Sequence, residues 1–600
     1  MTAGNDPGRA AANGRRPSFC VLFLAASLLA GLGGAIVWSY LPVLDNGFVW
    51  DDGANLGAAR AHWDRGLRGT AWAFREPYNG HYQPLTWLSY QVDARLWGAT
   101  PRGVHATNLL LHLVATAMVA VLGFLVAGSP ALSRVRPPDP PMDMRWRAGL
   151  AWVAAALFSL HPIRVESVAW ATERRDLLST VFALAALALH LRTSPADASL
   201  SPARGGVALL HALSALSRAQ LTLPFVLLLL DLWPLRRLGG GPGRAHRFAR
   251  LVREKGLSLA IAAASAAAAI WAQASSGALT AMGEHGAFDR LVQAGYGLAF
   301  YPAALLFGRT WLPLHERPFP FDPTEPRYLL PALSAAVALF GLWKLRRRAP
   351  SAAAAAGVYV LLALPVLGIA QSGIQLVADR YAYLATVPLV LLAAGAGAAL
   401  WGALVGPWRR WTRGALALAL LALLATNALA TRRQTLVWHS DETLWRHVLA
   451  HAGSCLADNN LGYLLYARGE GGPALHHLVR SLERVPTYGR PWRGIAALME
   501  TPWPEGAPDP GRVAATLERA ASTQRGSVLP RYATALAWGR AGDARRAEQG
   551  LREVLAVEPG HEGARLALAR LVDLRTGVRP LTDPSGSPAT ARAPRGAELP

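Results

Sequence analysis

Two adjacent aspartates, Asp51 and Asp52, follow the first long apolar run of the chain, in the stretch FVWDDGANL. Placing two carboxylates side by side costs free energy, because each negative charge raises the pKa of its neighbour. One of them could serve as the N-cap of the next helix, since Asp is a favoured N-cap residue. A cap needs only one Asp, so the pair is the first candidate for chemistry.

A second group of ionisable residues occupies the turn HPIRVESVAWATERRDLL, which separates two apolar runs. Ionisable residues close to a membrane boundary are costly and are often functional. The alternative is a cluster of interfacial salt bridges, such as Glu173 with Arg174 or Arg175. The candidates in this turn are His161, Glu166, Glu173, Arg174, Arg175 and Asp176.

Two further polar segments add candidates. The stretch VADRYAYL carries Asp379 and Arg380, and the long segment after the first apolar run carries His81. Arg is a natural ligand for phosphate because its planar guanidinium can donate two parallel hydrogen bonds. Arg380 could also be a plain anchor at the membrane interface. We take Asp51, Asp52 and Glu166 as candidate catalytic residues, and the other residues named above as candidate substrate-binding residues.

The elements that position these residues are membrane helices. The chain has 600 residues, of which 52% are hydrophobic and only 16% charged, and this composition excludes an ordinary soluble protein. A run that crosses a bilayer needs about 17–25 residues. Eleven apolar runs meet this length, and they begin near Phe19, Val104, Arg147, Leu177, Gly205, Leu221, Leu257, Tyr328, Ser351, Tyr383 and Gly414.

The basic residues predict the orientation of the bundle. The formal net charge is +22, and much of the Arg lies in short loops between apolar runs. The positive-inside rule accounts for this pattern without a nucleic-acid partner. With the basic loops in the cytoplasm, the N-terminus is inside, and the candidate residues and the C-terminal region are outside a cytoplasmic membrane. This topology requires that the segment 289–312 lies along the outer surface.

The chain after Thr431 has a different composition, in which charged and small residues alternate at helical spacing. Three small or helix-ending residues recur 73 residues later, as Gly469 and Gly542, Ala474 and Ala547, and Pro486 and Pro559. This distance is close to two tetratricopeptide repeats of about 34 residues with a small insertion, so a degenerate repeat should fill the gap. We expect a disordered tail (1–18), a membrane domain (19–431), a repeat domain (432–575) and a second disordered tail (576–600).

At these residues the chain resembles bacterial membrane proteins with tetratricopeptide repeats, related to the eukaryotic transmembrane-and-tetratricopeptide-repeat O-mannosyltransferases of the C-type glycosyltransferase superfold. The resemblance rests on FVWDDGANL, HYQPLTWLSYQVDARLWG, GVHATNLLLH, ALFSLHPIRVESVAWATERRDLLS, LTLPFVLLLLDLWPLRR, VADRYAYL and the repeats. One departure is SRAQLTLPF, where the family usually has Ser-Lys-Pro: Arg218 keeps the charge and Ala219 replaces the proline. The resemblance implies an all-α polytopic bundle of about eleven spans, followed by a tetratricopeptide-repeat array.

The resemblance also implies a function. The enzyme would move a sugar from a polyprenyl-phosphate carrier to an extracytoplasmic acceptor, a protein hydroxyl held by the repeats, with inversion. Asp51 would be the base, Asp52 would tune it, and Arg174, Arg175 or Arg380 would hold the carrier phosphate. No cofactor is implied, and the residues leave open a divalent metal between the acids. Two alternatives remain: a non-catalytic scaffold that displays the repeats, and a lipid-carrier flippase, which predicts ionisable residues deep inside the spans.

Overall fold

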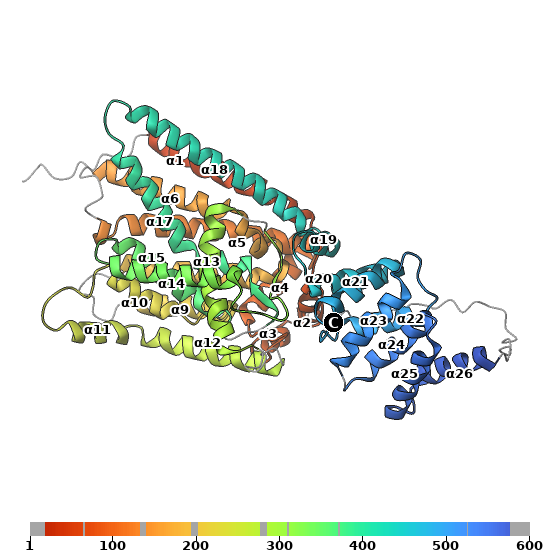
Figure 1. Cartoon of the computed structure of the whole chain (residues 1–600). Coiled ribbons are helices and arrows are strands. Elements are labelled where there is room, and N and C mark those ends of the chain that lie inside the picture. Colours follow the sequence, from red (N-terminus) through yellow and green to blue (C-terminus); the bar gives the residue numbers. More distant parts are fainter. Residues whose placement is uncertain are drawn as a thin grey trace, which may run out of the picture.

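The computed structural model of the chain describes residues 19–63, 66–132, 140–193, 202–276, 285–308, 311–369, 373–524 and 526–576. Over these ranges the chain forms a bundle of long helices followed by an array of shorter ones (Figure 1). The strands in the same ranges, β1 (His315–Glu316) and β2 (Gln375–Val377), form a short antiparallel pair. The expected all-α class is confirmed. The expected N-terminal tail and residues 577–600 lie outside the described residues.

Six described helical segments are long and apolar enough to cross a membrane. Two helix pairs with bends of 64° and 61° would raise this number to eight if each pair is one span. The six segments are Ser27–Asp45 in α1 (Phe19–Tyr40) and η1 (Leu41–Asp45), α5 (Pro101–Ala127), Ala171–Thr193 in η4 (Ala171–Glu173) and α8 (Arg174–Thr193), α12 (Gly256–Ser275), α14 (Pro326–Leu345) and α18 (Arg409–Val437). The bent pairs join α6 (Pro140–Ser159) to η3 (Pro162–Arg164) and α7 (Val165–Ala169), and η6 (Asp379–Tyr381) and α16 (Ala382–Ala385) to α17 (Val387–Ala403).

The expected count of eleven spans is therefore not confirmed. Three expected spans are the shorter helices α9 (Pro202–Ser217), α10 (Leu223–Leu232) and α15 (Pro350–Ala363), with 16, 10 and 14 residues. At a rise of 1.5 Å per residue they measure about 24, 15 and 21 Å, less than the roughly 30 Å of a hydrocarbon core. The 3-10 turn η5 (Leu364–Val366) extends α15, and η2 (Pro130–Leu132) follows α5.

The segment between the first two long helices folds into α2 (Asp52–Trp63), α3 (Leu67–Arg75) and α4 (Pro84–Trp97). Their sequences suggest aromatic faces that lie on the membrane interface. The structure instead buries Trp72, Trp87 and Tyr90 together with Val104 and Ala171. These aromatic rings pack α3 and α4 onto α5 and η4, because buried aromatic side chains contribute large apolar contact areas.

Helix α13 (Ala287–Phe307) is not one of the candidate spans. Near its start, the Arg290 guanidinium donates to the carbonyl of Ile369 (2.9 Å) and the Gln293 amide donates to the carbonyl of Leu376 (3.0 Å). Figure 1 shows α13 running across the direction of the neighbouring long helices. The expected position of this segment along the outer surface stays a prediction.

Eight helices follow α18 in the described part of the chain, which ends at residue 576. Around the first matched repeat, small residues set the packing distance: a Cβ on Gly462 would lie only 2.8 Å from Leu478, and Ala474 is fully buried. The pair α22–α23 occupies the interval between the two matched repeats. Assignment of the array to the tetratricopeptide type stays a prediction. The helices are α19 (Asp441–His451), α20 (Cys455–Ala467), α21 (Gly471–Arg484), α22 (Pro491–Glu500), α23 (Pro510–Ser522), α24 (Val528–Arg540), α25 (Ala544–Val557) and α26 (Glu562–Thr576).

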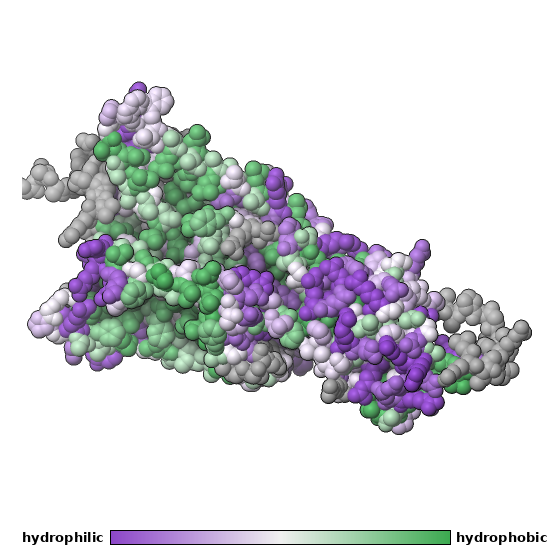
Figure 2. Space-filling model, viewed as in Figure 1, coloured by the Kyte–Doolittle hydropathy of each residue, from purple (hydrophilic) through white to green (hydrophobic). Residues whose placement is uncertain are grey.

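The surface divides along the molecule. Figure 2 shows mostly hydrophobic residues over the bundle and hydrophilic residues over the array. The basic helix α11 (Arg244–Arg253) lies at the end of the bundle opposite to the array (Figure 1). An apolar face over the bundle and a basic helix at one end are typical of a multi-span membrane protein. We call the end of the bundle that meets the array the array end.

Candidate functional site

Asp51 and Asp52 lie at the array end, where the chain enters α2. The Asp52 carboxylate is buried and accepts three hydrogen bonds: Oδ2 from the Val49 N–H (3.0 Å), and Oδ1 from the Thr172 N–H (2.8 Å) and hydroxyl (2.6 Å). These bonds join the start of α2 to η4, so Asp52 holds two segments together. Burial raises the pKa of Asp52 to about 7, although the hydrogen bonds from Thr172 and Val49 lower it.

The neighbouring Asp51 carboxylate is in a different position. Its Oδ1 atom is buried and has no hydrogen-bond partner among the described residues. The Asn55 side chain forms a hydrogen bond with the carboxylate, which lowers the pKa of Asp51. Burial raises the pKa of Asp51 to about 6; Arg175 and Arg380 lower this pKa, and Glu173 raises it. A carboxylate with this pKa is mostly ionised at pH 7 and can accept a proton, as a general base must.

Two arginines and two glutamates form a buried network beside Asp51. Arg175 Nη2 lies 2.5 Å from Glu173 Oε1, and Arg380 Nε lies 3.4 Å from the same oxygen. Arg380 also pairs with Glu166 through its guanidinium, and its backbone N–H donates to Glu166 Oε2 (2.9 Å). Arg175 Nη1 is buried and donates to no partner within the described ranges. The network therefore presents an unused donor near the unused acceptor of Asp51.

His81 and Arg218 belong to the same region. Burial lowers the pKa of His81 well below its ordinary value, and the charge of Arg175 lowers it further, so the imidazole is neutral. Arg218, in the turn between α9 and α10, pairs with Asp176 and also interacts with Glu173. The turn that departs from the family pattern thus contributes a cation to the region around Asp51.

Arg174 points away from this network, although it is adjacent to Arg175. Its Nη1 lies 2.5 Å from Asp93 Oδ2, its Nε donates to Asn108 (2.8 Å), and its Nη2 donates to the Val104 carbonyl (2.7 Å). Successive residues on a helix are rotated by about 100°, so two adjacent arginines face different neighbours. Arg174 is fully buried and locks α8 to α4 and α5.

Two other candidates also lie outside the network. His161 Nδ1 accepts a hydrogen bond from the Ile163 N–H (3.3 Å), as an N-cap does, and its ring packs edge-on against Trp311. Asp379 precedes Arg380 but its carboxylate faces His315, whose Nε2 lies 3.2 Å from Asp379 Oδ1. The structure therefore gathers one set of the candidates around Asp51: His81, Glu166, Glu173, Arg175 and Arg380.

Several residues of the site had no signal in the sequence. His315, which faces Asp379 outside the network, lies in the short strand β1, and no sequence motif marks it; Thr172 is a neutral residue inside the charged turn. Trp50 and Trp170 stack with ring centroids 4.6 Å apart, and the Arg380 guanidinium lies 5.3 Å from the Trp170 ring. In the described ranges, no group of three or more His, Cys, Asp or Glu side chains is arranged to hold a metal ion.

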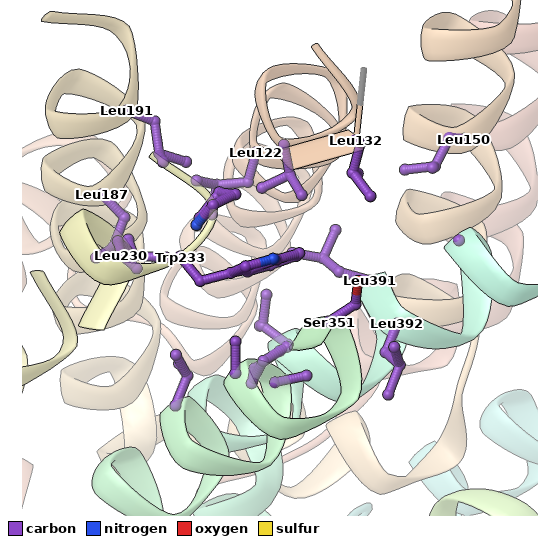
Figure 3. A pocket seen from close by; sticks show the side chains of 18 of the residues that line it. Leu122, Leu132, Leu150, Leu187, Leu191, Leu230, Trp233, Ser351, Leu391 and Leu392 are labelled. Carbon is purple, nitrogen blue, oxygen red and sulfur yellow. The ribbon is translucent and has the colours of Figure 1, made fainter. Parts of the chain in front are cut away.

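An apolar cavity of about 320 Å³ lies inside the bundle. Figure 3 shows Leu187 and Leu191 of α8 on one side, Leu391 on another, and the Trp233 ring across the space, with Ser351 near it. The lining also includes Leu384, which lies four residues after Arg380 in the same bent segment. The bent segment that carries Arg380 therefore also contributes to the lining of the cavity.

Comparison with known proteins finds no family model that matches the chain. Part of the chain is similar to curated proteins named as protein O-mannosyl-transferases. It is 34% identical over 192 residues to Protein O-mannosyl-transferase Tmtc1 of Drosophila melanogaster, covering 30% of this chain and 20% of that protein. It is 29% identical over 208 residues to TMTC1 of Mus musculus (32% and 19%) and 37% identical over 105 residues to TMTC4 of Homo sapiens (17% and 13%). The chain thus matches a fifth or less of the length of each of these relatives.

Proposed function

We propose that the chain is a membrane glycosyltransferase that moves a sugar from a polyprenyl-phosphate carrier to a hydroxyl group of a protein outside the cytoplasm. The similarity to proteins named as protein O-mannosyl-transferases supports transfer of a sugar to protein. The observation that carries the proposal is the pair of unused buried groups, Asp51 Oδ1 and Arg175 Nη1. Buried polar groups without partners are rare in folded proteins, and a ligand would satisfy them.

In the proposed reaction, Asp51 accepts the proton of the acceptor hydroxyl while the hydroxyl oxygen bonds to the anomeric carbon. The bond from that carbon to the phosphate oxygen breaks, and the phosphate leaves with the electron pair. Attack from the face opposite to the phosphate inverts the anomeric centre. Arg175 and Arg380 hold the phosphate, because guanidinium groups stabilise the charge that develops on a leaving oxygen.

The glutamates act on these arginines in the proposal. Glu173 contacts both Arg175 and Arg380, and Glu166 contacts Arg380, so the guanidinium groups are fixed before the donor arrives. Fixed charges stabilise a transition state more than mobile ones, because they need not reorganise during the reaction. Glu166 is therefore assigned as a residue that orients Arg380, and Asp52 as one that holds the backbone beside Asp51.

The apolar cavity supports a lipid-linked donor. An isoprenoid chain is an apolar ligand, and transfer into an apolar space is favoured by the hydrophobic effect. The lining is almost wholly aliphatic and aromatic, and Leu384 connects it to the segment that carries Arg380. In this arrangement the donor's phosphate lies at the array end, and part of its isoprenoid chain occupies the cavity in the bundle.

The helical array is proposed to be of the tetratricopeptide type, to lie outside a cytoplasmic membrane and to bind the acceptor protein. Stacked helix pairs form extended surfaces of the kind that bind protein segments. A chain that ends after Ala452 keeps α19 and lacks the later helix pairs. It should still transfer to a short hydroxyl-bearing peptide but lose transfer to a folded acceptor. Equal transfer to both acceptors would exclude a role of the array in acceptor binding.

The proposed activity is tested with purified protein in liposomes that contain polyprenyl-phosphate mannose and a Ser/Thr-containing acceptor. We expect sugar on the acceptor with the wild-type chain and a large loss with Asp51→Asn. The matched control is Asp45→Asn, because Asp45 lies in the same segment but is exposed and pairs with Arg102 at the surface (3.0 Å). No transfer with any polyprenyl-phosphate sugar tried, or equal transfer by wild-type and Asp51→Asn proteins, would refute the proposal.

A further inference from the structure

The residue before Asp51 has an unusual backbone conformation. Trp50 has φ +59°, in the left-handed region that non-glycine residues occupy only rarely. A bulky residue stays in this region only when its surroundings impose the conformation. The direction of the Asp51 side chain depends on this backbone, since the two residues share a peptide bond. The contacts that fix Trp50 therefore also fix the proposed base.

The main contact comes from the first helix of the array. The Trp50 N–H donates to Asp441 Oδ1 at 2.7 Å, across 391 positions of sequence. The Trp50 ring is stacked on Trp170 (4.6 Å, 11°) and meets the edge of Trp445 from α19 (5.1 Å, 68°). Just upstream, the Gly47 N–H donates to the His439 carbonyl (3.0 Å). Residues after α18 thus hold the segment that precedes Asp51.

We propose that Asp441 is a positioning residue: its carboxylate holds the Trp50 N–H and so directs the Asp51 side chain toward Arg175. This inference rests on the proposed function for its catalytic consequence. The array then has a second role besides binding the acceptor, because its first helix forms part of the site. Asp441 does not touch the reacting atoms in this scheme and acts only through the backbone of Trp50.

Substitutions at Asp441 separate this role from a general effect on folding. Asp441→Ala removes the acceptor of the Trp50 N–H, whereas Asp441→Asn keeps an Oδ1 atom that can accept the same hydrogen bond. The matched control is Glu442→Ala, which removes a carboxylate from the same turn of α19. Glu442 pairs with Arg446 and Arg468 and makes no contact with the Trp50 segment in the described structure.

Two measurements are made on the full-length wild-type chain and on these three variants. The first is amide hydrogen exchange in peptides that contain Trp50, which requires no enzyme activity. We expect faster exchange at Trp50 only in Asp441→Ala. The second is sugar transfer from polyprenyl-phosphate mannose. We expect Asp441→Ala to lower kcat by about 10²-fold, the order of loss that a 1 Å misplacement causes, while KM for the donor changes little.

Three results would overturn the inference: unchanged exchange at Trp50 in Asp441→Ala, an equal loss of kcat in Asp441→Asn, or an equal loss in Glu442→Ala. Rescue by Asp441→Asn together with slow exchange at Trp50 supports it. If the wild-type chain transfers no sugar, the proposed function fails, and the exchange data alone decide whether Asp441 holds the Trp50 backbone. The two failures are therefore distinguishable.

Discussion

Replacement of Asp51 by Asn is the most informative perturbation of this protein. Asn has nearly the same shape as Asp but cannot accept the acceptor's proton. Loss of a general base costs about 10²–10⁴-fold in rate. Since each tenfold is about 1.36 kcal/mol, this loss corresponds to about 3–5 kcal/mol of transition-state stabilisation. The assay is steady-state transfer of sugar from a polyprenyl-phosphate donor in liposomes.

The pH dependence of the proposed activity in the wild-type chain gives a second measure of the proposed role of Asp51. The base must be deprotonated, and burial raises the pKa of Asp51 to about 6. We therefore expect kcat/KM to fall as the pH is lowered through about 6 and to be level above it. The Asp51→Asn variant should lack this acidic limb, because its side chain does not titrate.

Stability distinguishes catalysis from a structural role. The pKa of Asp51 is about 6 in the folded protein against 3.8 ordinarily, so the folded state holds the proton more tightly than the unfolded chain does. Ionisation therefore destabilises the fold increasingly between pH 3.8 and about 6, by about 3 kcal/mol at most above that range. Asp51→Asn removes this cost, so its melting temperature at pH 7 should be unchanged or higher. Full turnover in this variant, or a melting temperature well below that of the wild-type protein, would refute the assignment of Asp51 as the general base.

Three further predictions use other parts of the molecule. Arg174→Met should destabilise the protein by about 3–5 kcal/mol in thermal unfolding, because it removes the buried Asp93 carboxylate's ion-pair partner. Arg175→Met should mainly weaken donor binding and turnover. A similar loss of stability in both variants would contradict this prediction. Leu187→Trp fills part of the apolar cavity and should raise KM for a long-chain polyprenyl-phosphate donor more than for a short-chain one, with equal changes counting against the cavity as a chain site. In a cysteine-free background, a cysteine at Gly240, where a side chain meets open space, should react with an impermeant maleimide only from the cytoplasmic side; labelling from outside would invert the topology.

The sequence predicted which segments carry the site because each of them follows or precedes an apolar run. Alternation of such runs places Asp51, the charged turn and Arg380 at the same end of a bundle. It does not tell which of two adjacent arginines faces a ligand. Arg174 and Arg175 are adjacent on one helix. Only the positions of Asp93 and Asn108 in the folded protein show that the Arg174 guanidinium already has partners inside the protein.

Helix length was less predictable than helix position. The apolar runs near Gly205, Leu221 and Ser351 form helices, but these helices are shorter than the thickness of a bilayer core. Apolar composition identifies a buried helix and a spanning helix equally well. Contacts across hundreds of residues, such as that from Trp50 to Asp441, leave no local pattern in the sequence.

The two adjacent carboxylates have different contacts, because their side chains lie in different surroundings. The Asp52 carboxylate faces Thr172 and Val49. It accepts hydrogen bonds from two N–H groups and one hydroxyl group, and these donors would lose their acceptor without it. Asp52→Asn would set an amide NH₂ against a backbone or hydroxyl donor, and an unsatisfied buried donor costs about 1–3 kcal/mol. Asp51 keeps one oxygen unpaired. In the proposed reaction, Asp52 fixes the backbone next to the base, Asp51, and so makes the position of that base reproducible.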